Sequence, residues 1–156
     1  MFRRKTTITR PDRARLLQVA GAKSNAISWA IFIDQLRREL ARSRVVDPAR
    51  VPSDVVTMHS TVRITEPATD RRPEVLTLVY PHEADVSAGK ISVLAPLGTA
   101  LLGARTGDVV RVPGSAGMRE IRVEEVVYQP EAQGRVRRRS PPRSIASGRW
   151  SRRIRH

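Results

Sequence analysis

Apolar residues in the first third of the chain recur at helical spacing. Between residues 26 and 43 they stand four, three and four positions apart, on one face of a helix: Trp29, Ile33, Leu36 and Leu40. An earlier helix is predicted to begin near Thr9, whose hydroxyl can cap its first turn, and to end at Gly21. Because the connection between these two segments is short, they are predicted to form an antiparallel helical hairpin, a short coiled coil, over residues 9–45.

Beyond residue 54 the pattern changes to strict alternation of apolar and polar positions. A period of two is typical of a half-buried strand, and the clearest case runs over residues 56–65. Further strands are predicted at 75–80, 91–94, 109–112 and 121–128. The alternation slips by one at Glu124 and Glu125, which predicts an irregularity in the last strand. A short helix is predicted at 96–102, ended by Gly103.

These elements predict an α+β protein with five segments. Residues 1–8 are expected to be a flexible N-terminus, residues 9–45 the helical hairpin, and residues 46–54 a linker that contains Pro48 and Pro52. Residues 55–134 are expected to form a domain of about five strands and one short helix. Residues 113–117 are rich in glycine and predict a loop within it, and residues 135–156 remain as a tail.

The tail carries much of the positive charge. The chain has 29 Lys and Arg against 15 Asp and Glu, and nine arginines with no acidic residue lie in residues 135–156. Proline and serine interrupt any apolar periodicity there, so the tail is predicted to be disordered. Such a segment attracts polyanions through counterion release. The arginines taken as nucleic-acid candidates are Arg135, Arg137, Arg138, Arg139 and Arg143.

Composition removes several kinds of chemistry. The chain contains no cysteine, which excludes disulfides, thiol catalysis and cysteine-ligated metals. Its three histidines have no ligand spacing, so neither a metal nor another cofactor is predicted. The basic start of the sequence is not followed by an apolar stretch, and no run approaches the length of a membrane span. We therefore expect a cytoplasmic protein with no membrane partner.

Two short stretches imitate catalytic motifs. Gly98 and Gly103 are spaced as in a phosphate-binding loop, but Ala104 and Arg105 occupy the positions of the required Lys and Ser/Thr. His82 and Glu83 place a base beside an acid, yet no nucleophile motif accompanies them, and a solvated turn is predicted there. The residues by themselves therefore predict a binding or interaction protein and no enzyme.

Several ordered strings resemble the GreA/GreB transcript-cleavage-factor family, and within it the regulators of nucleoside diphosphate kinase. These strings are DVVTMHS at 54–60, LTLVYP at 76–81, ISVLAPLGTALLG at 91–103 with GD at 107–108, and YQPEA at 128–132. The resemblance extends over roughly residues 9–134, although the helical part matches only in pattern. It implies a helical hairpin joined to an FKBP-like domain.

The resemblance also implies a partner, bacterial RNA polymerase. Members of the family dock on the rim of its secondary channel and direct the hairpin inward, and in Gre factors acidic residues at the tip help to hold a second Mg²⁺. Here the tip carries Lys23, Ser24 and Asn25, and no acid lies between Asp12 and Asp34. Because Mg²⁺ requires oxygen ligands, usually carboxylates, stimulation of cleavage is not expected. We expect a monomer that competes with Gre factors and alters nucleoside diphosphate kinase levels indirectly, without kinase activity.

By the same resemblance, the loop that contacts polymerase corresponds to Ala95, Pro96 and Leu97. The family's serine is replaced by Ala95, which removes one hydrogen-bonding group. An alternative is purely structural: Pro96 starts a helix and Leu97 fills the core. Prolyl isomerase activity is not predicted, because such activity needs an aromatic-lined pocket and only Tyr80 and Tyr128 are aromatic in residues 54–134.

A second functional hypothesis places the activity in the tail. In this interpretation the chain is a nucleic-acid-binding protein that acts through its arginine-rich C-terminal segment. The two hypotheses are compatible, since the tail could tether a polymerase-bound protein to nascent RNA or DNA.

Overall fold

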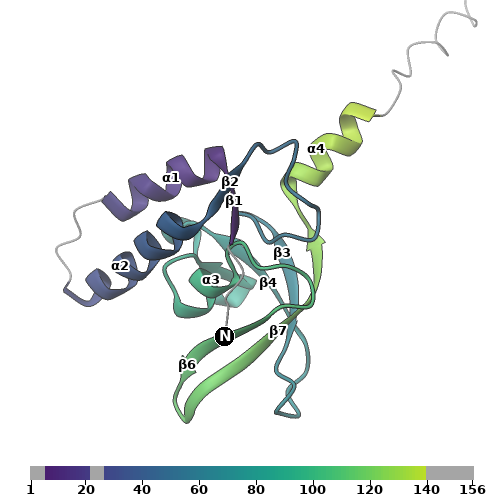
Figure 1. Ribbon diagram of the computed structural model, residues 1–156. Coiled ribbons are helices and arrows are strands. Elements are labelled where there is room, and N and C mark those ends of the chain that lie inside the picture. The colour runs from purple at the N-terminus through teal and green to yellow at the C-terminus, as the bar shows by residue number, and fades with distance from the viewer. Residues whose placement is uncertain (1–5, 22–26, 140–156) are drawn as a thin grey trace, which may run out of the picture.

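The computed structural model describes residues 6–21 and 27–139, and their side chains except those of 27–29 and 135–139. Two helices, α1 (Arg10–Gly21) and α2 (Ile27–Arg42), precede a five-stranded sheet and lie side by side (Figure 1). The guanidinium of Arg37 in α2 donates a hydrogen bond of 2.6 Å to the carbonyl of Ala20, near the end of α1. This bond satisfies one of the carbonyls that a helix end leaves without an intrahelical partner.

The sheet has the order β5-β4-β3-β7-β6. Its strands are β3 (Thr61–Thr65), β4 (Glu74–Val79), β5 (Lys90–Ser92), β6 (Val109–Gly114) and β7 (Gly117–Tyr128), and only the β4–β5 pair is parallel. Between β4 and β5 lie two 3₁₀ turns, η1 (Pro81–Glu83) and η2 (Val86–Ala88). The helix α3 (Pro96–Leu101) contacts α2, β5 and β6, and α4 (Pro130–Arg139) extends away from the end of β7 (Figure 1). The α+β class is therefore confirmed.

The predicted irregularity in the last strand is confirmed. Arg63 in β3 pairs with Glu125, and the next residue, Ile64, pairs with Val123, so Glu124 is an extra residue in β7. An extra residue bends a strand and increases its twist. A second register shift lies between Thr61 and Val62.

The prediction of a flexible segment over residues 1–8 is wrong for residues 7 and 8. Thr7–Thr9 form a strand, β1, that pairs in parallel with β2 (Arg44–Val46), and Ile8 is buried in the core. The predicted linker accordingly begins inside β2, at Val46. Three-residue strands leave no readable periodicity, and these two become neighbours only because α2 returns the chain to the start of α1 (Figure 1).

The strand predicted from residue 56 begins five residues later. Val56 and Met58 are buried as the alternation requires, but residues 56–60 form a turn in which the N–H of Ser60 donates to the carbonyl of Thr57. His59 adopts a left-handed conformation with φ of 65°. Burial pattern alone cannot distinguish such a turn from a strand, because both can place alternate residues in the core.

The loop predicted at 113–117 is shorter than expected. Pro113 and Gly114 belong to β6 and pair with Met118 and Gly117 of β7, which leaves only residues 115–116 to connect the strands. Gly117 has φ of 114°, a conformation that glycine adopts without the steric cost of a side chain.

The tail boundary also needs correction. Residues 135–139 continue α4, so the prediction that disorder begins at Arg135 is wrong for these five residues. Pro130 and Glu131 start the helix, and arginine is a favourable helix residue, so the helix propagates into the basic segment. The remaining tail residues, 140–156, lie outside the described part of the chain.

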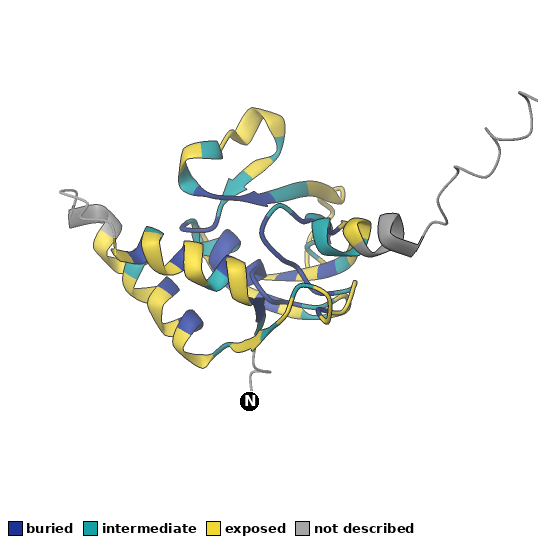
Figure 2. Cartoon of the chain, turned by 90° about the horizontal axis from the view of Figure 1, so that it is seen from above, coloured by how far each residue is buried: buried dark blue, intermediate teal, exposed yellow. Residues whose placement is uncertain are grey.

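A single hydrophobic core joins the helices to the sheet. Leu16 of α1 and Leu36 and Leu40 of α2 are buried in it, together with residues of α3 and of the sheet. Figure 2 shows buried positions on the helices and along the strands. The predicted apolar stripe of the second helix is thus confirmed at Leu36 and Leu40, while Ile33 is partly buried against the core. The side chain of Trp29 lies outside the described ones. Within residues 6–21 and 27–139, no helix is both long and apolar enough to cross a lipid bilayer.

Candidate functional site

The predicted docking residues lie at the start of α3. Ala95 is the N-cap residue, with φ of −64° and ψ of 146°, and its side chain makes no capping hydrogen bond. Pro96 occupies the first turn, where its missing N–H costs nothing. Leu97 is half-buried and packs against the core, so the structural interpretation of these two residues fits the fold. The side chains of Pro96 and Leu97 are nevertheless only partly buried, so part of each remains accessible.

Close packing fixes the loop that presents these residues. A Cβ atom on Gly98 would lie 2.0 Å from the carbonyl oxygen of Ser92, so only glycine fits there. The hydroxyl of Thr99 donates to the carbonyl of Val93 over 2.6 Å, and the N–H of Leu94 donates to the hydroxyl of Ser92. The start of α3 is therefore held rigidly against β5.

Two of the strings that carry the family resemblance meet in space. The side-chain amide of Gln129, which follows β7, donates to the carbonyls of Pro52 and Val55 over 2.7 and 2.9 Å. Glu131 in the first turn of α4 accepts a hydrogen bond of 2.7 Å from the hydroxyl of Thr57. The turn before β3 and the origin of α4 are thus joined through side chains.

The same turn also binds α1. The backbone N–H of Met58 donates to Oδ2 of Asp12 over 3.2 Å, and the N–H of Asp12 donates to the hydroxyl of Thr9. Asp12 is only 8% exposed, and this burial raises the pKa of its carboxyl above the ordinary value. The hydrogen bond from Met58 opposes that shift. The Asp12 carboxyl group in the first turn of α1 is therefore buried and hydrogen-bonded within the protein.

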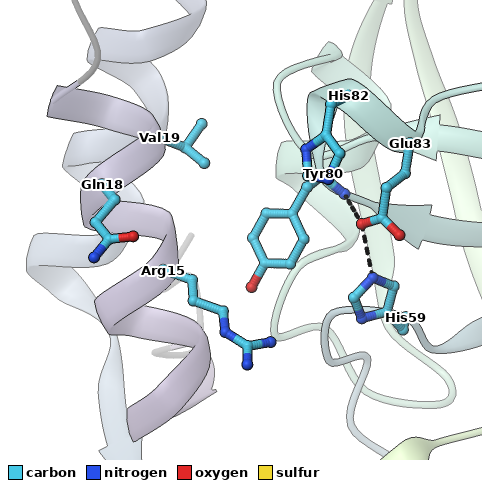
Figure 3. A pocket seen from close by; sticks show the side chains of 7 residues that line it. All are labelled: Arg15, Gln18, Val19, His59, Tyr80, His82 and Glu83. Atoms are coloured by element: carbon cyan, nitrogen blue, oxygen red, sulfur yellow. Dashed lines mark hydrogen bonds and ion pairs between the residues drawn. The ribbon is translucent and has the colours of Figure 1, made fainter.

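A pocket of about 420 Å³ opens beside this connection, between α1 and the segment that follows β4 (Figure 3). From α1, it is lined by Arg15, Gln18 and Val19. From the sheet side, it is lined by His59, Tyr80, His82 and Glu83. The Nε2 atom of His59 lies 2.9 Å from Oε1 of Glu83, and this contact lowers the pKa of the Glu83 carboxyl.

Tyr80 forms the inner wall of the pocket. Its side chain is only 6% exposed, and its hydroxyl has no hydrogen-bond partner among the described residues. Burial raises the pKa of the Tyr80 phenol to about 12, with the Asp12 carboxylate acting in the same direction. The hydroxyl is consequently protonated at neutral pH and can donate a hydrogen bond. The ring of His82 stacks on that of Tyr80 at an interplanar angle of 15°, and His59 meets it edge-on.

The other predicted site residues fall partly outside the described chain. Lys23, Ser24 and Asn25 lie outside it, as does Arg143. The backbone of Arg135, Arg137, Arg138 and Arg139 is helical, and their side chains are not among those described. In the described residues, no group of three or more His, Asp or Glu side chains is arranged to hold a metal ion.

Sequence reasoning missed the pocket. It assigned His82 and Glu83 to a solvated turn, whereas Glu83 binds a histidine 24 positions earlier in the chain. Asp12 and Met58 are separated by 46 positions. No local pattern signals such pairs, because the sheet and the helices bring them together.

The fold is α+β, and the strings that carry the family resemblance lie around the turn before β3 and the starts of α3 and α4. The family described as "Transcription elongation factor, GreA/GreB, C-term" matches residues 51–128. The chain belongs to this GreA/GreB family.

Individual relatives agree with this assignment. The chain is 43% identical over 103 residues to the regulator of nucleoside diphosphate kinase of Escherichia coli K12, covering 65% of this chain and 74% of that protein. It is 32% identical over 96 residues to transcription elongation factor GreA of Bartonella tribocorum, covering 62% and 60%. A solved GreA/GreB elongation factor from Nitrosomonas europaea superposes with a TM-score of 0.66 at 41% identity, covering 81% of this chain and 100% of that one.

Proposed function

We propose that this protein is a regulator that binds RNA polymerase at the rim of its secondary channel and competes there with Gre cleavage factors. In this proposal the domain is FKBP-like and docks through the start of α3, while α1 and α2 form a hairpin directed into the channel. The protein does not stimulate cleavage of RNA itself. One observation carries the proposal: the segment between the two helices lacks the carboxylates that a second Mg²⁺ requires.

The nearest acids on each side support this argument. Asp12 lies in the first turn of α1, about 14 Å of helix away from Gly21, and is buried against Met58. Asp34 lies about 10 Å along α2 from Ile27 and forms an ion pair of 2.9 Å with Arg38. Neither carboxylate is available to a metal ion at the connection between the helices.

The similarity to the Escherichia coli regulator suggests an indirect effect on nucleoside diphosphate kinase. We propose that this effect is a change in the abundance of the kinase that follows from altered transcription. Purified protein is then expected to transfer no phosphate between nucleotides, and its deletion in the source bacterium is expected to change kinase protein and transcript together. Kinase activity of the purified chain would contradict this part of the proposal.

A competition experiment tests the main proposal. Core RNA polymerase is loaded with a labelled Gre factor, and the full chain is added while cleavage of a stalled transcript is measured. We expect displacement of the Gre factor and slower cleavage. Faster cleavage by the full chain in the absence of any Gre factor would overturn the proposal.

A test variant and a control variant examine docking through the start of α3. Leu97→Lys places a charge on the half-buried docking residue and is expected to abolish competition. Val86→Lys, which changes a residue that is 92% exposed in η2, serves as the control and is expected to compete normally. Thermal unfolding of both variants separates loss of docking from loss of folding. A folded Leu97→Lys variant with full competition would exclude this docking surface.

Nucleic-acid binding through the tail is a second proposal, favoured by the continuation of α4 into the arginines at 135–139. α4 extends away from the end of β7, so its backbone carries these residues outward from the domain (Figure 1). Deletion of residues 135–156 is expected to weaken DNA and RNA binding and to reduce its salt dependence while polymerase binding persists. Loss of polymerase binding on this deletion would make the tail the principal binding element.

A further inference from the structure

We propose that the pocket between α1 and the Tyr80–Glu83 segment binds the phosphate group of a small molecule. The inference does not depend on the proposed function. It rests on the hydroxyl of Tyr80, a polar group that is enclosed by protein, faces the pocket and has no partner among the described residues (Figure 3). A buried polar group without a hydrogen bond costs free energy, and a ligand that accepts from it removes this cost.

The pocket offers mainly hydrogen-bond donors. The Arg15 guanidinium projects from α1 toward the Tyr80 hydroxyl (Figure 3), and its proximity opposes the burial that raises the pKa of the phenol. Among the described residues, no acid forms an ion pair with Arg15. The amide of Gln18 adds further donors from the next turn of α1. Phosphate oxygens accept several hydrogen bonds from different directions and match the fork of an arginine, so this set favours a phosphate.

Two acids lie near this site and must be reconciled with an anionic ligand. Glu83 lines the pocket, but its Oε1 already accepts from the His59 ring at 2.9 Å and from the backbone N–H of Tyr80 at 3.4 Å. Asp12 is close enough for its charge to raise the pKa of the Tyr80 phenol, and its Oδ2 accepts from the N–H of Met58. Both carboxylates are therefore engaged by N–H donors, and Arg15 is left to meet an incoming anion.

The left-handed backbone conformation of His59 supports the presence of a binding site here. His59 is the one residue other than glycine with positive φ among those described, and this conformation brings its ring to the pocket wall. Such strain persists where the surrounding structure enforces it, and it concentrates at binding sites. Here the enforcing contacts are the Met58–Asp12 hydrogen bond and the bond from the His59 N–H to the carbonyl of Leu78.

The size of the pocket points to a small organic phosphate. Its volume of about 420 Å³ exceeds the space needed by inorganic phosphate and falls within the range of small-molecule sites. His82, exposed and stacked on Tyr80, provides a flat surface beside the phosphate position for the remainder of the ligand. Arg15 lies on α1 and Tyr80 directly follows β4, so a ligand that contacts both would stabilise the position of the helix pair against the domain.

The test uses the full chain and inorganic phosphate as the probe, followed by NMR of the histidine rings and by calorimetry. Acetate and chloride at matched ionic strength serve as the comparison anions. We expect saturable binding of phosphate, with shifts at His59 and His82, and no saturable binding of the other two. Adenosine monophosphate, which carries the phosphate on a larger group, is expected to bind more tightly than phosphate.

Tyr80→Phe is the decisive variant. It removes only a hydroxyl that has no hydrogen-bond partner among the described residues, so the stability of the ligand-free protein is expected to be unchanged or increased, while phosphate binding weakens about tenfold or more. Tyr128→Phe, at an exposed tyrosine outside the pocket, is the matched control and is expected to bind normally. Arg15→Gln is expected to weaken binding similarly, with Arg13→Gln on the same helix as its control.

Three binding results and one stability result would overturn the proposal. The binding results are an absence of saturable phosphate binding, equal binding of acetate and phosphate, and full phosphate binding by a folded Tyr80→Phe variant. Reduced stability of ligand-free Tyr80→Phe would also contradict it, because such a loss would mean that the hydroxyl already has a partner within the protein.

Discussion

Asp12 and Met58 connect the helix pair to the sheet. The backbone N–H of Met58, in the turn before β3, donates to Oδ2 of Asp12 in the first turn of α1 over 3.2 Å. The Asp12 side chain is almost fully buried at this junction. The position of the helix pair relative to the domain therefore depends on a polar contact as well as on the hydrophobic core.

This contact predicts a distinctive pH dependence. Burial raises the pKa of Asp12 above its ordinary value in the folded protein, so the unfolded chain releases this proton at lower pH than the folded one. The contribution of Asp12 to stability is accordingly most favourable below the unfolded pKa and declines as pH rises through the folded pKa. Urea unfolding at acidic and at neutral pH measures this contribution to the unfolding free energy.

Asp12→Asn supplies the comparison, because asparagine keeps a carbonyl oxygen for Met58 but does not titrate. The unfolding free energy of the wild type minus that of Asp12→Asn is expected to decrease from acidic to neutral pH. An increase over that range would show that the folded pKa of Asp12 is lowered.

Gln129 is expected to be a critical structural residue. Its side-chain amide donates to two backbone carbonyls, those of Pro52 and Val55, and it is almost fully buried. Gln129→Ala leaves both acceptors without this donor and is expected to cost about 2–4 kcal/mol of unfolding free energy. Gln133→Ala, at an exposed position of α4, is the control and is expected to stay within about 0.5 kcal/mol of the wild type. Chemical denaturation of both variants provides the measurement.

Two glycine substitutions are expected to have opposite effects. In α3, Gly98→Ala places a Cβ atom 2.0 Å from the Ser92 carbonyl oxygen and is expected to destabilise the protein by about 3 kcal/mol or more. In α4, the Cβ atom of Gly134→Ala meets no atom of the described part of the chain within 4 Å, and the variant is expected to be more stable by about 0.5–1 kcal/mol. Thermal unfolding of both variants measures whether stability falls or rises. A Gly98→Ala variant as stable as the wild type would show that the start of α3 can move away from β5.

Ala95→Ser is expected to stabilise the start of α3. Ala95 has the extended backbone conformation of an N-cap but no side-chain acceptor for the first N–H groups of the helix. A serine hydroxyl supplies that acceptor and is expected to add about 1 kcal/mol of stability. The change also restores the family's serine in the proposed docking loop, so tighter binding to polymerase is expected in the same variant. Denaturation and a polymerase-binding titration measure the two effects separately.

Much of the fold could be read from local pattern. The burial of Leu36 and Leu40, the helix ended by Gly103 and the extra residue at Glu124 all follow from periodicity or from backbone chemistry within a few residues. Short elements without periodicity could not be read in this way. The strands β1 and β2 exist because two distant three-residue segments become neighbours.

The candidate sites divide along the same line. The sequence alone determined the family, the start of α3 as a candidate docking surface and the missing carboxylates between the helices, since these depend on which residues follow one another. Only the tertiary structure decided that Asp12 accepts a hydrogen bond from Met58 and that Glu83 accepts one from His59. It also decided that Tyr80 and Arg15 line the same pocket. The physical reason is that each of these relationships joins groups on separate elements, whose distance is set by packing of the core rather than by spacing along the chain.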